Sequence, residues 1–278
     1  MVHNQEPLIS VMMPSHNASR YLEATVVSIQ NQTYTNWELV FVDDGSTDDT
    51  LAVIQTLADK DARIRVFAMP HGGRGRARNT CLKNLQGEFV AVCDSDDISF
   101  PERFEKQLAF LKAHPEIGGV GSWWIPFATE NPEQKGPIRR FPTEPERVKV
   151  AFRRGKMQFH NATAMIRTEV FKRFGKYNVE LRRAQDYEFF SRLSRGGILF
   201  SALPEPLLYY RQEAEIPSLK YFRENGMFMA YADRILDGAT ETFNDFSGSI
   251  LGRAWRTYYT LKFGYFYVKI LSLNLLGR

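Results

Sequence analysis

The chain has 278 residues, of which 44% are hydrophobic and 24% charged, so it can bury a full α/β core and lacks the composition of a disordered protein. A net charge of +4 and a pI of about 9.0 fit an anionic substrate or an anionic membrane surface, but they are too weakly basic to indicate nucleic acid as a partner. The two cysteines, Cys81 and Cys93, form no disulfide framework and match no zinc spacing, which predicts a reducing compartment.

The start of the chain is polar and lacks the pattern of a signal peptide. No stretch of about 18 residues is free of charge, so we expect no membrane-spanning helix. Together with the cysteine content, this predicts a cytoplasmic protein; the alternative location is the inner face of the cell membrane.

The first half of the chain alternates between short apolar runs and helical patterns. Ser19 is the expected cap of the first helix, and Thr47 or Asp48 of the second. The order strand–helix, repeated four times, predicts a mostly parallel sheet with right-handed crossovers. The expected strands are 8–13, 37–42, 64–68 and 89–93, and the expected helices are 20–30, 49–58, 76–84 and 102–113.

The pattern changes after Gly118. Four prolines between 130 and 145 indicate a loop, and everything after Ser218 has a helical pattern. In between, we expect strands at 120–125, 161–166 and 207–211, and helices at 147–154, 168–174 and 184–195.

The tail at 255–276 is rich in aromatic residues, interrupted by basic ones. At about 100° per residue, Arg253 and Arg256 project nearly opposite Lys262 and Lys269, so the basic residues do not share one helical face. Two interpretations stay open: the tail packs against the catalytic domain or a second subunit, or it contacts a membrane surface.

Three carboxylates, Asp94, Asp96 and Asp97, directly follow the apolar run at 89–93. Such a run suits a strand buried on both faces, and open α/β sheets bind ligands at the carboxyl ends of their strands. Three acids within four residues repel one another unless a cation lies between them, and Mg²⁺ or Mn²⁺ prefers oxygen ligands. A solvated acidic turn that caps the next helix is the alternative.

Polar clusters also follow two earlier strands, as Pro14-Ser15-His16-Asn17 and Asp43-Asp44-Gly45-Ser46. Parallel strands bring such ends to one edge of the sheet, where a carboxylate can accept from a nucleobase or ribose. A loop with Gly72, Gly73 and Gly75 precedes a helix and carries arginines, a combination that suits phosphate binding. Taken alone, the same pattern is also typical of an ordinary surface loop.

Six blocks of the first half resemble family 2 glycosyltransferases in order and in register. They are Val11-Met12-Met13-Pro14-Ser15-His16-Asn17, Gln30-Asn31-Gln32-Thr33-Tyr34, Val42-Asp43-Asp44-Gly45-Ser46-Thr47-Asp48, Arg76-Ala77-Arg78-Asn79, Gly87-Glu88-Phe89 and Asp94-Ser95-Asp96-Asp97. Looser matches continue to Tyr210-Arg211, so the resemblance covers about residues 8–215 and leaves the tail outside.

The resemblance implies the GT-A fold, an α/β architecture with a Rossmann-like, mostly parallel central sheet flanked by helices. We expect a catalytic domain at 1–217, with a nucleotide-sugar-binding half at 8–117 and an acceptor half at 118–217, followed by a C-terminal helical extension at 218–278. It further implies inverting transfer of a sugar from a nucleotide-diphosphate donor, with a UDP-sugar expected, to a hydroxyl of a glycan or lipid-linked acceptor in surface polysaccharide or glycolipid synthesis.

The resemblance also assigns roles to residues. Asp186 would be the general base, Asp96 the ligand of Mn²⁺ or Mg²⁺, and Asp94 a ribose contact or a second metal ligand. The residues expected to bind the nucleotide sugar are Pro14, Ser15, Asn17, Asp44, Arg78, Asp94 and Ser95. Candidate acceptor residues are Trp123, Trp124, Gln185 and Arg211; strand alternation sends the two tryptophans to opposite faces, so one of them belongs to the core.

Two residues depart from the family pattern. Gln185 replaces the usual glutamate before Asp186, and no histidine follows Tyr210-Arg211, where the family often has one. Glu213 or His160 could supply the missing ligand. Asp186 could also serve only as a helix cap. Two other functions remain open: a catalytically weak nucleotide- or carbohydrate-binding protein on this fold, and a sugar-phosphate nucleotidyltransferase.

Overall fold

The computed structural model describes residues 6–129, 131, 133–153, 157, 159–212 and 218–275, with the backbone alone for residues 153 and 263–275. The strands are β1 (Ile9–Ser15), β2 (Trp37–Asp44), β3 (Ile64–Met69), β4 (Phe89–Val92), β5 (Ile98–Ser99), β6 (Ile117–Ala128), β7 (Met165–Arg167) and β8 (Leu199–Gln212). The helices are α1 (Ser19–Gln30), α2 (Thr50–Ala58), α3 (Arg74–Asn84), α4 (Arg103–Ala113), α5 (Pro145–Arg153), the 3₁₀ turn η1 (Asn161–Thr163), α6 (Thr168–Phe174), α7 (Gln185–Arg195), α8 (Leu219–Leu236), α9 (Phe243–Gly248) and α10 (Ile250–Leu275).

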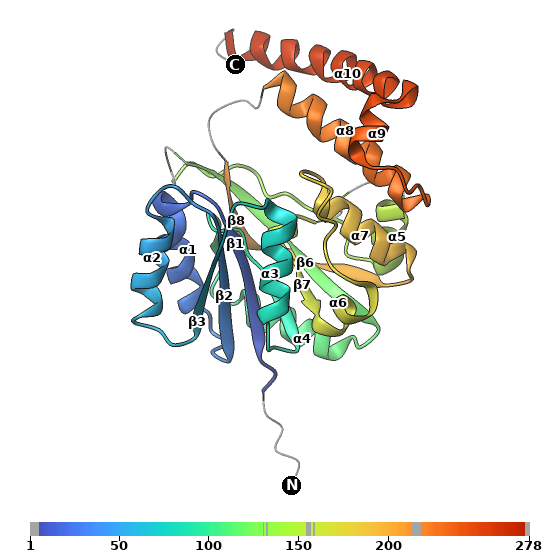
Figure 1. Cartoon of the computed structure of the whole chain (residues 1–278). Helices are drawn as coiled ribbons and strands as arrows, with labels where there is room; N and C mark the ends of the chain where they lie inside the picture. The colour runs from blue at the N-terminus through green and yellow to red at the C-terminus, as the bar shows by residue number, and fades with distance from the viewer. Residues whose placement is uncertain are drawn as a thin grey trace.

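The strands form one sheet in the order β3-β2-β1-β4-β7-β6-β8-β5 (Figure 1). The pairs β3-β2, β2-β1, β1-β4 and β6-β8 are parallel, whereas β7 runs antiparallel to both of its neighbours and β5 antiparallel to β8. The predicted mostly parallel α/β sheet is therefore confirmed, and its carboxyl edge carries the polar clusters found in the sequence.

Helices cover both faces of the sheet because its central strands are apolar on both sides. In β1, Val11 and Met13 pack with α1, α2 and α4, while Met12 packs on the opposite face with α3. The aromatic side chains of α5 and α7 extend this second core under the acceptor half, where Phe152 and Phe190 stack with ring centroids 5.6 Å apart. Both layers hold the strand ends rigidly in place.

Three predictions of local structure were wrong. The segment 161–166 is not one strand: the turn η1 closes with Thr163 N donating to His160 O, and β7 begins only at Met165. Ser19 does not cap α1, because Ala18 occupies the cap position and Asp48 accepts from both the Ser19 backbone N–H and its hydroxyl. The cap position of α2 is likewise held by Asp49, without a side-chain hydrogen bond, and not by Thr47 or Asp48.

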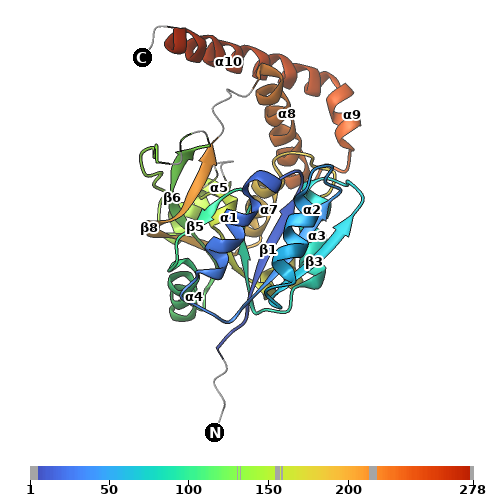
Figure 2. The ribbon, with the colours of Figure 1, turned by 90° about the vertical axis from the view of Figure 1, so that its left-hand side faces the viewer.

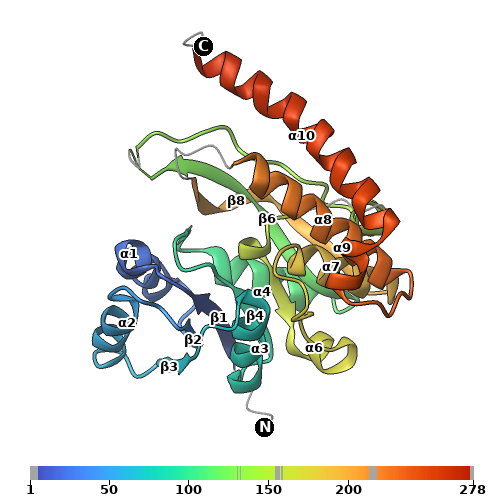
Figure 3. The same ribbon diagram turned by 45° about the horizontal axis from the view of Figure 1, so that its top comes forward.

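The C-terminal helices lie on the side of the molecule toward which the carboxyl end of β1 points, opposite the N-terminus (Figures 1 and 2). Helix α8 rests on α7, where the Tyr187 hydroxyl donates to Asp233, and α10 runs along α8 (Figure 3). Within the described residues, no helix is long and apolar enough to cross a membrane. The domain boundary expected at 217 stays a prediction.

Candidate active site

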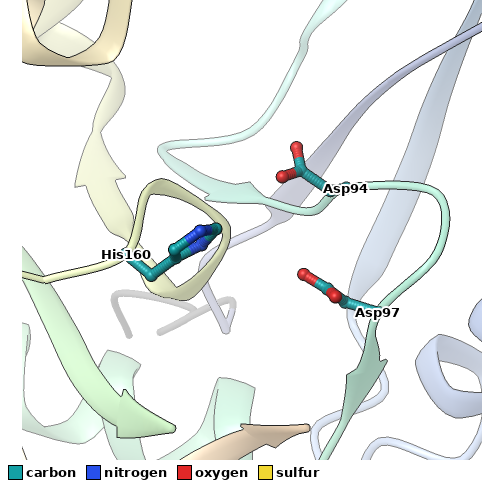
Figure 4. Close-up of side chains that lie close together, drawn as sticks. All are labelled: Asp94, Asp97 and His160. Carbon is teal, nitrogen blue, oxygen red and sulfur yellow. The ribbon is translucent and has the colours of Figure 1, made fainter. Parts of the chain in front are cut away.

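The acidic loop between β4 and β5 meets His160 at the carboxyl edge of the sheet. Asp94, Asp97 and His160 each place a ligand atom within 4.8 Å of the others, and all three side chains point into the same space (Figure 4). The antiparallel pairing of β4 with β7 brings the two segments together, because Val92 N donates to Ala164 O four residues after His160. A group suited to a metal ion thus exists among the described residues. It contains Asp94, an expected ligand, and His160, a candidate substitute, together with Asp97, for which no contact was expected; Asp96, the other expected ligand, is not part of this group.

Arg211, at the end of β8, fixes the acidic loop. Its backbone N–H donates to Asp97 Oδ1 at 2.9 Å, and its Nε donates to the backbone oxygen of Asp96 at 2.7 Å. Asp97 therefore does not cap the following turn, and its second oxygen, Oδ2, is buried without a partner among the described residues. The side chain expected to contact an acceptor holds the loop in the described structure.

Burial and neighbouring negative charge raise the pKa values of two of the acids, Asp96 and Asp97. Burial, reinforced by the charge of Asp94, raises the pKa of Asp96 to about 6. Burial and the charges of Asp96 and Asp94 raise the pKa of Asp97 well above its usual range. A bound divalent cation would compensate this buried negative charge, so the loop fits Mg²⁺ or Mn²⁺ by charge and by oxygen donors.

His160 is a neutral imidazole held by its own turn. Its Nδ1 accepts from Ala162 N at 3.4 Å, and burial lowers its pKa. With Nδ1 as acceptor, the neutral ring carries its proton on Nε2, which is then a donor; metal ligation through Nε2 would need the other tautomer. Glu213, the other substitute expected from the sequence, lies outside the described residues.

The first two strand ends are tied together by their polar side chains. Ser15 Oγ donates to Ser95 Oγ at 3.0 Å, which links the end of β1, after Pro14, to the acidic loop. Asn17 has a positive φ of 53° and accepts from Thr47 N at 2.8 Å, which links β1 to the loop after β2. These contacts bring the residues expected to bind the nucleotide sugar to one edge.

Asp44 organises the glycine loop that precedes α3. Its carboxylate accepts from Gly72 N at 2.7 Å and from Gly73 N at 2.9 Å. The His16 and His71 rings pack at a tilt with centroids 4.4 Å apart, and the Nδ1 of each lies at hydrogen-bond distance from the Asp44 backbone oxygen. The carboxylate expected to hold a nucleobase is thus shared with the loop, and two histidines that the sequence did not single out flank it.

Arg78 is a buried cation without a full set of partners. It comes from α3, its guanidinium lies 5.1 Å from the ring centroid of Tyr177, and its Nε and Nη1 have no hydrogen-bond partner among the described residues. Burial works against the charged form, but the charges facing it, Asp94 and Asp186 among them, raise the pKa of Arg78 on balance. The site therefore holds a permanent positive charge with donors still available.

Asp186 lies in the first turn of α7 but is not its cap. Ala184, with a φ of 57°, occupies the cap position, and Asp186 Oδ1 accepts from Tyr187 N at 2.9 Å. Its charge acts on Arg78, Tyr177 and His160. The neighbouring Gln185 is buried, and its Nε2 has no partner in the described part of the chain.

The two tryptophans have different surroundings, as alternation predicts, but both are only half-buried, so the prediction that one of them belongs to the core was wrong. Trp123 Nε1 donates to Phe141 O at 3.0 Å, in the loop that precedes α5. Trp124 packs edge-on against His160 and Tyr210, with ring centroids 5.7 and 5.0 Å away, and its Nε1 has no partner among the described residues. Trp124 is therefore the one beside the acids.

Three residues of the site escaped the sequence analysis. Asn161 is buried, and both polar atoms of its amide lack partners within the described residues. The Tyr177 hydroxyl is buried in the same way, and the Tyr210 ring packs at a tilt against His160 with centroids 4.2 Å apart. Adjacency to His160 was a signal for Asn161, and the Tyr210-Arg211 match was one for Tyr210, whereas Tyr177 is placed by tertiary packing alone.

Comparisons with known proteins identify relatives of this chain. The family model described as Glycosyl transferase family 2 matches residues 10–175. EpsE of Bacillus subtilis, assigned as a glycosyltransferase, is 32% identical over 240 residues, or 84% of each chain. WfgD of Escherichia coli, named UDP-Glc:alpha-D-GlcNAc-diphosphoundecaprenol beta-1,3-glucosyltransferase, is 40% identical over 105 residues, which cover 37% of this chain and 41% of WfgD.

A solved structure shares the fold. The mannosyltransferase PcManGT of Pyrobaculum calidifontis, in complex with GDP-Man and Mn²⁺, aligns with a TM-score of 0.62 over 93% of this chain and 74% of its own, at 18% identity. The architecture expected from the sequence is thereby confirmed.

Proposed function

Because the chain belongs to glycosyl transferase family 2 and has the GT-A fold, it is a glycosyltransferase, and we propose that it moves a sugar from a nucleotide diphosphate to an acceptor hydroxyl with inversion. The proposed donor is a UDP-sugar and the proposed acceptor a glycan or lipid-linked sugar of a surface polysaccharide. The name of WfgD, which gives UDP-Glc as donor and a diphosphoundecaprenol-linked acceptor, supports both choices. A lipid-linked acceptor would bring the reaction to the cytoplasmic face of a membrane.

One observation carries this proposal: buried polar atoms without partners gather around the acidic loop. Arg78 offers two donors, Asp97 one oxygen and Gln185 one amide N–H. Buried polar groups in folded proteins are nearly always hydrogen-bonded, and each one left unpaired costs about 1–3 kcal/mol. A polar ligand that supplies the missing partners accounts for their arrangement.

The donor would lie across the ends of β1, β2 and β4. Ser15, Asn17, Asp44 and Ser95 would face the nucleoside, together with the backbone at Pro14. Arg78 supports the leaving diphosphate, because a buried guanidinium is a fixed charge that needs no reorganisation as negative charge develops. The negative charge of Asp94 helps to raise the pKa of Arg78 and so to keep it charged.

The proposed metal ligands are Asp94 and Asp96, with Mn²⁺ or Mg²⁺ as the ion and Asp97 Oδ2 available to it. A bound ion would neutralise charge on the departing diphosphate. His160, in the tautomer that accepts from Ala162, instead donates toward a phosphate or carboxylate oxygen.

Asp186 would take the proton from the acceptor hydroxyl. A carboxylate is a suitable base when it lies within hydrogen-bond reach of that hydroxyl, and one base with one displacement gives inversion. Trp124 would offer its ring edge and free N–H to the sugar bound there. Gln185 leaves Asp186 without a second acid beside it.

A thermal-shift panel of UDP-, GDP- and dTDP-sugars, each with and without Mn²⁺, tests the proposal. The matching donor should raise Tm only when Mn²⁺ is present, since a ligand that binds the folded state stabilises it by mass action. Asp96→Asn should abolish the metal-dependent part of the shift, while Asp59→Asn, an exposed control, should keep it. Equal shifts with and without the ion would remove the metal assignment, and no shift with any donor would remove the function.

A further inference from the structure

The first half of α10, up to Lys262, is the part whose side chains are described, and its inner face packs against α8 and α9. Trp255 and Tyr259 belong to the core shared by α8 and α9. A Cβ added at Gly226 of α8 would lie 2.5 Å from the Tyr259 ring, so the two helices already touch as closely as their atoms allow. The side of α10 that faces the protein is therefore closed.

The outer side of α10 is apolar and exposed. Ile250 is 80% exposed and Leu261 70%, and Tyr258 is exposed by nearly half. At about 100° per residue, Ile250 and Leu261 fall within about 20° of each other, which makes one stripe along the first three turns. Large apolar side chains lined up in this way are unusual on a surface that meets only water.

Basic side chains flank this stripe on both sides. At about 100° per residue, Arg253 and Arg256 lie about 60° and 120° from Ile250 in one direction, and both are exposed. Lys262 is exposed about 120° from Ile250 in the other direction, near the edge of the inner face, where its ammonium lies over the rings of Tyr258 and Tyr259. Arg253 donates to Gly248 O and Arg256 to Ser247 O, but within the described residues neither forms an ion pair. The sequence of α10 contains no Asp or Glu over its 26 residues.

We propose that this outer face, made of Ile250, Arg253, Arg256, Tyr258, Leu261 and Lys262, binds the surface of an anionic lipid bilayer. An apolar stripe bordered by cations is the arrangement of helices that lie in the headgroup region with their axis along the membrane plane. Helix α10 lies on the side toward which the carboxyl end of β1 points, so a bilayer there would be on the active-site side of the protein (Figures 1 and 2).

Charge distinguishes this occupant from a second copy of the chain. A two-fold dimer through the outer face would set the same basic residues against one another, with no acid on α10 to pair with them. Anionic lipids supply the opposite charge over the whole face. The orientation of the site toward the bilayer rests on the proposed function, whereas the lipid binding itself does not.

Sedimentation of the full chain with vesicles tests the proposal. We expect it to sediment with vesicles of equal parts phosphatidylglycerol and phosphatidylcholine, and to stay in solution with phosphatidylcholine alone. The triple variant Arg253→Gln, Arg256→Gln, Lys262→Gln should bind at least about tenfold more weakly, and Leu261→Ser severalfold more weakly. Glutamine keeps a donor for the α9 carbonyls, so the fold should hold.

The matched control is the triple variant Lys60→Gln, Lys83→Gln, Lys112→Gln, which changes the net charge equally at exposed ends of α2, α3 and α4. It should bind vesicles almost like the unaltered chain. Equal loss in both triple variants, absence of vesicle binding, or a lipid-free dimer that Leu261→Ser dissociates would each overturn the proposal. The donor-induced Tm shift, measured on the same samples, reports the proposed function separately.

Discussion

The two edges of the central sheet bury polar side chains in opposite ways. At the amino edge, the buried Glu38 carboxylate accepts from Ser10 Oγ at 2.6 Å, from Arg65 Nη1 at 2.7 Å and from Gln86 N at 2.6 Å. At the carboxyl edge, Asn161 and Arg78 are just as buried but keep polar atoms without partners among the described residues. The two edges belong to one continuous sheet, and they differ in whether their buried polar groups have hydrogen-bond partners within the protein.

This difference separates structural from functional burial. Folding alone favours a buried carboxylate whose hydrogen bonds are all made inside the protein, as at Glu38. Unpaired buried atoms lower stability, and their concentration at one edge indicates that a ligand completes them. Trp37, at the amino edge, departs from this division, because its Nε1 has no hydrogen-bond partner among the described residues. Its ring instead packs against the Arg63 guanidinium, which lies 3.7 Å from the ring centroid.

The largest effect should come from removing the proposed base at the carboxyl edge, Asp186. Asp186→Asn keeps the size and the hydrogen bond from Tyr187 N but cannot take a proton. We expect kcat for transfer to fall by about 10³-fold, the typical contribution of a general base, with the donor-induced Tm shift retained.

Asp59→Asn, which changes an exposed carboxylate at the end of α2, should leave kcat unchanged and serves as the control. Initial rates with the donor identified by the thermal-shift panel make the comparison. If Asp186→Asn transferred sugar at the rate of Asp59→Asn, the role of Asp186 as base would have to be abandoned.

The same contrast explains which parts of the molecule the sequence could predict. Strands β1, β2 and β4 were predictable because they are buried on both faces, and a run of apolar residues is the direct signature of such burial. Strand β8 was predicted only at 207–211 because Pro204 and Pro206 interrupt its pattern. In the sheet, Pro206 pairs with Trp123 at a register shift, where a missing N–H is tolerated.

In the site, the sequence could indicate residues that follow a strand, such as Asp94 and Asp44, because local order places them at the edge. It could not foresee that Arg211 would fix the acidic loop, because that contact joins residues 114 positions apart. The unpaired amide of Asn161 was equally hidden: a missing partner is a property of the folded surroundings and leaves no trace in local spacing.

A smaller effect, on stability and not on the rate of transfer, is expected at the amino edge. Glu38→Gln removes the charge that Arg65 faces and turns one acceptor into a donor. We expect the free energy of unfolding to fall by about 2 kcal/mol, in the range for hydrogen bonds to charged groups, with kcat per folded molecule unchanged. Urea denaturation and initial rates measure the two quantities. A tenfold loss of rate without loss of stability would contradict the division between the edges.

The smallest effect on stability is expected at Asn161, and it best distinguishes a buried group that serves binding from one that serves folding. Asn161→Leu replaces an unpaired buried amide by an apolar side chain of similar size, so the free energy of unfolding should stay equal or rise by up to about 1 kcal/mol, while transfer falls by about tenfold. Asn79 is the matched control, because its amide donates to Tyr177 O at 2.8 Å and accepts from Tyr177 N at 2.9 Å.

Asn79→Leu should therefore cost about 2 kcal/mol, since it breaks two hydrogen bonds and leaves two backbone groups unpaired. Urea denaturation of the two variants side by side compares a partnered amide with an unpartnered one on the same fold. Equal destabilisation of both would mean that the Asn161 amide is already satisfied in the protein, by ordered water for example, and that its lack of a protein partner does not mark a ligand. If Asn161→Leu instead kept its stability and transferred sugar more slowly, the result would show that Asn161 serves binding at a cost in the free energy of unfolding.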